Sequence, residues 1–286
     1  MNVLIFGSQG VVGKALVDLL VVEKGHTVYG VDKCVETVHP QNDHEQEGSV
    51  ENIGDVRRAI FDTTPDIIVN LTHSCNVADP DMTELTKINV LGTANILTCA
   101  IAKPVLGHRR IPVISCGWAT PFPPHSILGA SFKGHRSLLS ALEGLNLAKT
   151  IGLPCVLSTE SPSSAYMSIL SRIVDVYEES CNHIIEFRDE DFYGTVQPWC
   201  TPKQAAEFIV ASFNSKPKVI DHFPFDKPIN IIIPLLISLG LEDVQILSQY
   251  ARKKPVNGFF KTRVKSPAPA LALDTVQKYI KEHPHG

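Results

Sequence analysis

The stretch NVLIFGSQGVVGKALVDLL at residues 2–20 decides the fold. A short apolar run at 2–6 is typical of a buried strand, and apolar residues at helical spacing follow from residue 13. Three glycines separate the two patterns with the spacing GxxGxxG. The first permits a tight turn, the second lets backbone N–H groups approach a pyrophosphate, and the third lets the helix pack close to the strand. The predicted phosphate-binding loop comprises Gly7, Ser8, Gln9, Gly10, Val11, Val12 and Gly13.

An acidic residue follows the second predicted strand, 27–31, at the position a dinucleotide site needs. Asp32 lies 19 residues after Gly13, where a carboxylate can accept hydrogen bonds from the adenosine ribose hydroxyls. Its charge would repel a 2′-phosphate, so the sequence predicts NAD(H) as cofactor rather than NADP(H), with Lys33 softening that preference. The alternative is a tight βα turn beside a solvated aspartate.

Strand and helix patterns alternate through the first half of the chain. Further strands are predicted at 66–71, 111–115 and 154–158, and helices at 53–61, 83–102 and 134–150. This alternation indicates an α/β fold, a Rossmann-type doubly wound parallel sheet with helices on both faces.

The alternation loosens beyond residue 158, where a strand is predicted at 184–187 and a helix at 202–214 with Thr201 as its N-cap. We expect an NAD(P)-binding Rossmann domain at residues 1–158. A small α/β substrate-binding lobe at residues 159–286, interleaved with the first domain, would complete the chain.

The composition is that of an ordinary globular protein. The 286 residues carry 26 basic and 30 acidic side chains, a net charge of −4, so no basic field attracts nucleic acid or anionic lipid. No apolar run approaches the roughly 20 residues of a bilayer span, and the N-terminal residues read directly as a strand rather than a secretion signal. Seven cysteines without a CxxC pair indicate reduced thiols and a cytoplasmic location. No residue spacing indicates a metal site.

Two further motifs carry a family resemblance. Residues 63–70, TTPDIIVN, and 89–97, NVLGTANIL, resemble the extended short-chain dehydrogenase/reductases, the nucleotide-sugar epimerase, dehydratase and reductase family. The opening and the first motif are most similar to the dTDP-4-dehydrorhamnose reductase branch. The resemblance implies an NAD-dependent enzyme of a small-molecule substrate, with Asn89 beside the cofactor and active site. It also implies a possible homodimer through the helices at 83–102 and 134–150.

The resemblance assigns further cofactor contacts. Ser49 and Val50 fall where relatives contact the adenine, with serine in place of the usual aspartate. The nearby Asp55 is interpreted as part of a solvated helix face. Leu71, Thr72 and His73 replace the small residues that follow the fourth strand in relatives, and His73 either bonds a phosphate or ribose or is a structural histidine.

The family's Tyr-x-x-x-Lys pair, which transfers the substrate proton, is missing. Aligning the segment ILGASFKG at 127–134 places Leu128 at the tyrosine and Phe132 at the lysine, and a shift by one residue retains only Lys133. Ser115 and Cys116 stand at the end of the preceding strand, where relatives carry a proton-relay hydroxyl. The predicted catalytic residues are therefore Ser115, Cys116 and Lys133.

Each replacement has a less specific alternative. Cys116 is an acid or nucleophile if its pKa is lowered, and otherwise a buried inert thiol. His125 and His135, which flank the same segment, are interpreted as surface histidines, with a general acid as the alternative. The sequence thus indicates an NAD-binding oxidoreductase or epimerase acting on a nucleotide sugar or similar small hydroxy/keto metabolite with a non-standard acid/base group. The alternative is a catalytically drifted or inactive member, with a cyclase, lyase or isomerase role or as an NAD-sensing regulatory protein.

Overall fold

The structure is a computed structural model of the whole chain, and its contacts divide the chain into two compact units. One unit contains Met1–Pro154 and Thr201–Pro224, and the other contains Cys155–Cys200 and Phe225–Gly286. The residues described below are 1–35, 44–74, 81–101, 110–118, 127–143, 147–153, 155–156, 184–187, 196–197, 199–214, 221–222, 229–230 and 245–248.

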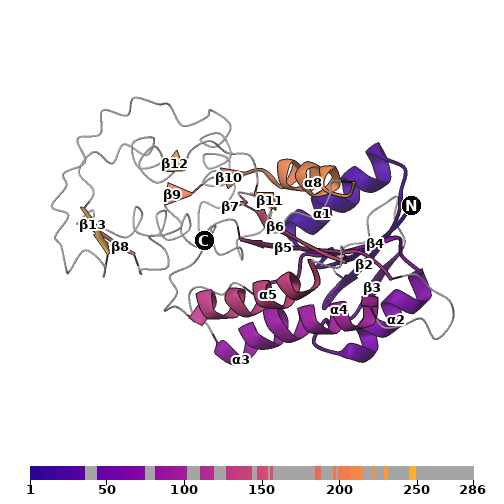
Figure 1. Cartoon of the computed structure of the whole chain (residues 1–286). Coiled ribbons are helices and arrows are strands. Elements are labelled where there is room, and N and C mark those ends of the chain that lie inside the picture. The colour runs from indigo at the N-terminus through magenta and orange to yellow at the C-terminus, as the bar shows by residue number, and fades with distance from the viewer. Residues whose placement is uncertain are drawn as a thin grey trace. The chain divides into compact units, whose positions relative to one another are not determined.

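A seven-stranded sheet in the order β11-β6-β5-β4-β1-β2-β3 forms the centre of the first unit (Figure 1). Every pairing in it is parallel. From β3 to β6 the order is that of a doubly wound dinucleotide-binding fold, which confirms the predicted fold class. The strands are β1 (Asn2–Phe6), β2 (Thr27–Asp32), β3 (Glu45–Glu47), β4 (Ile67–Asn70), β5 (Val113–Trp118), β6 (Ala148–Leu153) and β11 (Asp221–His222).

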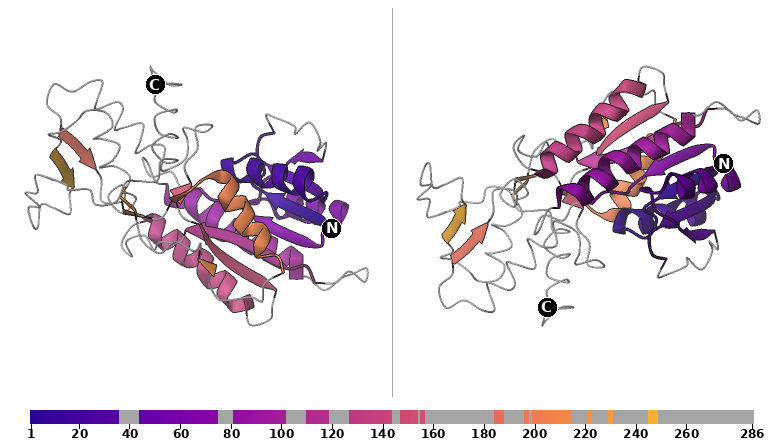
Figure 2. Two further views of the ribbon diagram at one scale, coloured as in Figure 1. Left: turned by 90° about the horizontal axis from the view of Figure 1, so that it is seen from above. Right: turned by 90° about the horizontal axis from the view of Figure 1, so that it is seen from below.

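Helices cover both faces of this sheet (Figure 2). On one face α1 (Val11–Asp18) and α8 (Pro202–Ala211) pack over side chains such as Ile5 and Ile114. On the other, α2 (Ile53–Thr63), α4 (Thr93–Ile101) and α5 (Ile127–Glu143) pack over alternate residues of the same strands. The other helical segments in the described part of the chain are α3 (Met82–Leu85) and two π-helical stretches, Leu19–Glu23 and Thr86–Gly92.

The helix α8 confirms the predicted N-cap at Thr201. The Thr201 hydroxyl accepts from the backbone N–H of Gln204 at 3.2 Å, and the Gln204 carboxamide accepts from the N–H of Thr201 at 3.0 Å, a complete capping box. The chain therefore returns to the first unit with a well-defined helix start.

Three short strand pairs are described in the second unit. A parallel pair joins β7 (Cys155–Val156) to β10 (Trp199–Cys200), and another joins β8 (Ile184–Phe187) to β13 (Gln245–Ser248). An antiparallel pair joins β9 (Val196–Gln197) to β12 (Ile229–Asn230). The strand predicted at 184–187 is present as β8.

The sixth strand lies earlier than predicted. The helix expected at 134–150 ends by Glu143, and residues 148–153 form β6, paired with β5 from Val113↔Ala148 to Trp118↔Leu153. The short strand β7, Cys155–Val156, does lie within the predicted range 154–158, but it pairs with β10, and the sixth strand of the main sheet is β6. Every residue of β6 from Ala148 to Gly152 is buried. Because both faces of this strand are covered, its sequence lacks the alternation of apolar and polar residues by which a half-exposed strand is recognised.

Within the described part of the chain, no helix combines the length and the apolar character that crossing a bilayer requires.

Candidate functional site

The glycine loop between β1 and α1 has the geometry that its spacing predicts. Gly7 has φ of +87° and donates its N–H to the carbonyl of Val31 at 2.8 Å. A Cβ on Gly13 would lie 2.1 Å from the Gly7 carbonyl oxygen, so α1 could not start where it does with any other residue. Gly10 caps α1 without a side-chain bond. The first N–H groups of α1 therefore have no side-chain cap, which suits an incoming anion.

Two carboxylates flank this loop. Asp32, at the end of β2, accepts from the backbone N–H of Gln9 at 3.0 Å and from that of Lys33 at 2.8 Å. Glu45, which sequence reasoning missed, accepts from the Ser8 hydroxyl at 2.6 Å. Its carboxylate occupies the space beside Gly30 that a Cβ there would fill. The carboxylates thus make the loop's surroundings negative on the side where the adenosine 2′-phosphate of NADP would add further negative charge.

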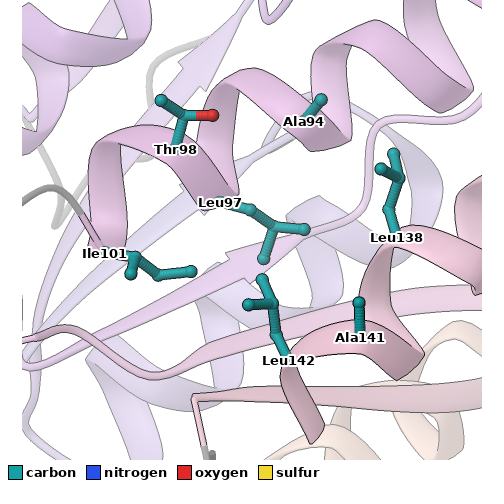
Figure 3. A pocket seen from close by; sticks show the side chains of 7 residues that line it. All are labelled: Ala94, Leu97, Thr98, Ile101, Leu138, Ala141 and Leu142. Atoms are coloured by element: carbon teal, nitrogen blue, oxygen red, sulfur yellow. The ribbon is translucent and has the colours of Figure 1, made fainter.

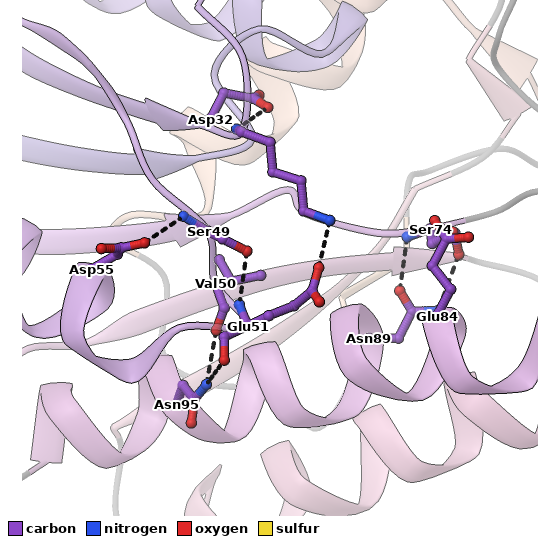
Figure 4. A network of polar contacts seen from close by, with 10 residues as sticks. Asp32, Ser49, Val50, Glu51, Asp55, Ser74, Glu84, Asn89 and Asn95 are labelled. Carbon is purple, nitrogen blue, oxygen red and sulfur yellow. Dashed lines mark hydrogen bonds and ion pairs between the residues drawn. The ribbon is translucent and has the colours of Figure 1, made fainter.

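The Lys33 ammonium group is engaged by a carboxylate. It forms an ion pair with Glu51, and just over half of the lysine side chain is exposed (Figure 4). This pair draws the positive charge of Lys33 toward Glu51, which limits the softening of NAD preference expected from the sequence.

The segment after β3 is held by its own polar contacts (Figure 4). The Asp55 carboxylate accepts from the Ser49 N–H at 3.2 Å, and the Asn95 amide donates to the Val50 carbonyl at 2.9 Å. Asp55 lies in α2, as the sequence predicts, but its side chain is only partly solvated, because it also holds the backbone of the predicted adenine segment. The Ser49 hydroxyl accepts from the Glu51 N–H at 3.2 Å, and the Val50 side chain is buried.

Asn89 braces the segment after β4. Its amide oxygen accepts from the Ser74 N–H at 2.9 Å, and its amide nitrogen donates to the Ser74 carbonyl and to the Ser131 hydroxyl, each at 3.1 Å. The side chain is fully buried and both amide hydrogens are used. Asn89 thus positions this segment against α5. The direct cofactor contact that the resemblance implied stays a prediction.

A buried polar network lies at the carboxyl ends of β4 and β5. The Asn70 amide oxygen accepts from the Thr72 N–H at 3.0 Å, and its nitrogen donates to the Ser115 hydroxyl at 3.1 Å. Ser115 in turn shares a 2.8 Å hydrogen bond with Nε2 of His135 on α5. The Asn70, Ser115 and His135 side chains are all fully buried.

His135 contradicts its interpretation as a surface histidine. It lies on the inward face of α5 with Phe132 and Leu139, which are three and four residues away. His73, just after β4, stacks on Phe132 with ring centroids 5.4 Å apart and meets His135 edge-on at 4.8 Å. The structure thus brings Ser115 and His73 together with a histidine for which the sequence favoured a surface position. His125 lies outside the described residues. The i, i+3 spacing of Phe132 and His135 was the signal that could have identified it.

The other two predicted catalytic residues point elsewhere. Cys116 follows Ser115 on β5 and faces the opposite side of the sheet, in the apolar cluster under α1 and α8. Burial raises the pKa of its thiol well above the usual value, so the inert-thiol interpretation holds and the catalytic one is wrong. Lys133 is exposed, since it follows Phe132 by 100° around α5 and shares the outer face with Ser137. Lys133 is not part of the buried cluster around Ser115, and its catalytic role stays a prediction.

Both clustered histidines are neutral near pH 7. Burial lowers the pKa of His73 to about 4, although a hydrogen bond to the Leu71 backbone opposes the shift. Burial, with His73 as a neighbour, lowers the pKa of His135 well below its ordinary value. No group of three or more potential metal ligands occurs in the described part of the chain.

Comparison with known proteins agrees with this geometry. Residues 3–126 match the NAD dependent epimerase/dehydratase family. No curated protein is significantly similar to the chain in sequence. Among solved structures, dTDP-glucose 4,6-dehydratase from Bacillus anthracis in complex with NAD has a TM-score of 0.69 at 13% identity, covering 99% of this chain and 98% of that one.

Two other solved structures align over 99% of this chain and 99% of their own length. Pal from Bacillus thuringiensis has a TM-score of 0.73 at 15% identity, and WbmH from Bordetella bronchiseptica in complex with NAD+ has a TM-score of 0.64 at 19% identity. Over residues 3–126 the chain therefore has the sequence pattern of the NAD-dependent epimerase/dehydratase family, and its fold is that of these three solved structures.

Proposed function

We propose that this protein binds NAD(H) and acts as an oxidoreductase or epimerase on a nucleotide sugar or a similar small hydroxy/keto metabolite, using a non-standard acid/base group. The observation that carries the proposal is the glycine loop: an α1 N-terminus without a side-chain cap, adjacent to the Asp32 carboxylate. Similar structures in complex with NAD or NAD+ support it.

The described residues fit this cofactor. The N–H groups of residues 10–13 would hold the pyrophosphate, and Asp32 would bind the adenosine ribose in place of its bond to Gln9. Ser49 and Val50 would flank the adenine, and Leu71, Thr72 and His73 would lie beside the nicotinamide half. The bound cofactor would supply a hydride acceptor or donor.

Turnover of candidate substrates tests the catalytic half of the proposal. The purified chain is incubated with NAD+ and a panel of UDP- and dTDP-sugars, NADH absorbance is followed, and the products are examined by NMR. We expect oxidation, dehydration or epimerisation of at least one sugar. Saturable NAD+ binding without turnover of any member would contradict the catalytic proposal and favour the second candidate.

A second candidate function is a catalytically drifted role, either as a cyclase, lyase or isomerase or as an NAD-sensing regulatory protein. The observation that favours it is Phe132, which stands where the resemblance implies the catalytic lysine. This side chain is buried and stacked on His73, so no ammonium group occupies that position. A hydride-transferring enzyme without this pair needs another proton-transfer group.

The proposed partners are a small-molecule substrate and a second copy of the chain. An open apolar groove of about 450 Å³ runs between α4 and α5 (Figure 3). A two-fold axis beside it would bury the same face of both copies. The net charge of −4 gives no basis for nucleic-acid or membrane binding. A cytoplasmic location is proposed from cysteine usage, and the described cysteines Cys34, Cys99, Cys116 and Cys200 are free thiols.

An arginine in this groove is expected to separate the dimer. Thr98→Arg places a charge on an exposed position of the groove, where pairing would desolvate it. We expect the dimer dissociation constant to rise at least about tenfold, measured by analytical ultracentrifugation. The control is Phe61→Arg on α2, where 59% of the side chain is exposed. A wild-type chain that sediments as a monomer, or a Thr98→Arg variant that pairs like the control, would contradict the proposal.

A further inference from the structure

Two buried imidazole nitrogens lack partners at the carboxyl ends of β4 and β5. They are Nε2 of His73 and Nδ1 of His135, neither of which has a hydrogen-bond partner. Their rings meet edge to face with centroids 4.8 Å apart. A buried polar atom without a partner costs about 1–3 kcal/mol. Two such atoms on touching rings therefore indicate a place for a polar ligand group.

The hydrogen bonds around His135 determine which of its nitrogens carries the proton. The Asn70 amide is oriented by its oxygen, which accepts from the N–H and the hydroxyl of Thr72 at 3.0 and 2.6 Å. Its nitrogen therefore donates to the Ser115 hydroxyl oxygen at 3.1 Å. The other described contact of the Ser115 oxygen is Nε2 of His135 at 2.8 Å. Because a buried hydroxyl hydrogen requires an acceptor, we assign the Ser115 hydrogen to this nitrogen. Because Nε2 accepts, the proton of the neutral ring is on Nδ1.

The nitrogen of His73 that lacks a partner, Nε2, carries no proton, in contrast to Nδ1 of His135. The Leu71 backbone hydrogen-bonds this ring in the sense that favours its protonated form, which identifies the ring N–H as donor to the carbonyl. Since Nε2 is the atom without a partner, the donor is Nδ1, and Nε2 carries a lone pair. Phe132, stacked at 5.4 Å with an interplanar angle of 13°, holds the ring in place.

The pair thus presents one N–H donor and one lone-pair acceptor. A metal ion would need lone pairs on both nitrogens, and a phosphate would need donors on both. An alcohol hydroxyl matches both groups, since it donates one hydrogen bond and accepts another. The Ser115 hydroxyl is fully buried with its hydrogen engaged, so it serves to orient His135 and not as a nucleophile.

We propose that His73 and His135 together form the hydroxyl-binding and proton-transfer group that replaces the missing tyrosine and lysine, a role that rests on the proposed NAD-dependent function. A bound NAD+ would accept as hydride the C–H electron pair of a secondary alcohol while the C=O bond forms. The hydroxyl proton passes to Nε2 of His73, while the His135 N–H stays bonded to the oxygen. Reduction by NADH is the reverse, with the proton returned from His73.

The tautomers can be measured without substrate or cofactor. Long-range ¹⁵N–¹H NMR of the full-length chain at pH 7 should show His73 and His135 as neutral rings, both protonated at Nδ1. The imidazole signals are assigned with the variants His73→Phe and His135→Asn, because each variant lacks the signals of one histidine ring. An Nε2-protonated His135, or a charged ring at either position, would overturn the proposal. This result is independent of cofactor binding, so it separates a failed inference from a failed proposed function.

Variants test the chemical step once the sugar panel yields a substrate. We expect His73→Phe and His135→Leu to lower kcat at least about 100-fold, with NAD+ affinity of the His135 variant within about twofold of wild type. His135→Asn places an amide N–H near the position of Nδ1 and should recover part of the rate, and this variant also replaces His135→Leu if the latter fails to fold. Ser137→Ala, on the outer face of α5, is the control. Rates of both histidine variants within twofold of the control would overturn the proposal.

Discussion

Replacing Gly13 by alanine is expected to destabilise the protein by about 3 kcal/mol or more, measured as the loss in free energy of unfolding by urea. The added Cβ would lie 2.1 Å from the Gly7 carbonyl oxygen and 2.6 Å from that of Ser8. Both atoms belong to the backbone, so relief requires α1 to move away from β1. That helix contributes Leu16 and Val17 to the apolar core, and NAD+ binding should be lost with its position.

Gly10→Ala is the matched variant in the same loop. Its Cβ would lie 3.4 Å from the Gly7 carbonyl oxygen, an ordinary contact, and its backbone φ is −67°. We expect a stability change within about 1 kcal/mol but at least about tenfold weaker NAD+ binding, because the methyl group occupies the approach of the pyrophosphate. Equal melting temperatures of the Gly13→Ala and Gly10→Ala variants would refute this account of the loop.

Acidification from pH 6.5 to pH 4 is expected to cost about 3 kcal/mol of stability through His73 alone. The pKa of His73 is lowered to about 4 in the folded chain, from the ordinary 6.5 that applies on unfolding. Between these values the unfolded chain binds more protons, so stability is full above pH 6.5 and falls as the pH drops toward 4. His135, whose pKa is lowered well below its ordinary value, adds a loss of the same sign.

Urea unfolding of wild type and His73→Phe at pH 7, 5.5 and 4 measures this loss. The variant should lose less stability than wild type across the window, because phenylalanine does not titrate and still stacks on Phe132. His44→Gln, at an exposed histidine outside the cluster, is the control and should follow wild type. Parallel pH profiles for wild type and His73→Phe would show that His73 is not buried as a neutral ring.

The parallel sheet and the glycine loop follow from sequence because their causes are local. The three glycines and Asp32 lie within one βαβ unit, and the strand and helix patterns there are strongly periodic. Glu45 is different. Its carboxylate reaches Ser8 and fits against Gly30 only after β3 pairs with β2, so no local pattern announces it. The same holds for Asp55, which reaches back to the Ser49 N–H across a helix start.

Side-chain direction explains why the catalytic residues predicted from the sequence differ from those that cluster in the structure. Ser115 and Cys116 are neighbours in sequence, yet strand alternation sends one to His135 and the other into the apolar core. On α5, a rotation of 200° about the helix axis separates Lys133 from His135. The lysine side chain is therefore exposed and the histidine side chain is buried. The tyrosine–lysine alignment points to residues that replace the missing pair in sequence, whereas the proposed replacement in space comes from the segment after β4 and from α5.

Titration of the full-length wild-type chain with NAD+ and with NADP+ by calorimetry tests the central claim most directly. The uncapped α1 N-terminus and the carboxylates of Asp32 and Glu45 predict saturable 1:1 binding of NAD+. NADP+ should bind at least about tenfold more weakly, a difference of about 1.4 kcal/mol. Absence of NAD+ binding at millimolar concentration, or tighter binding of NADP+, would contradict the account.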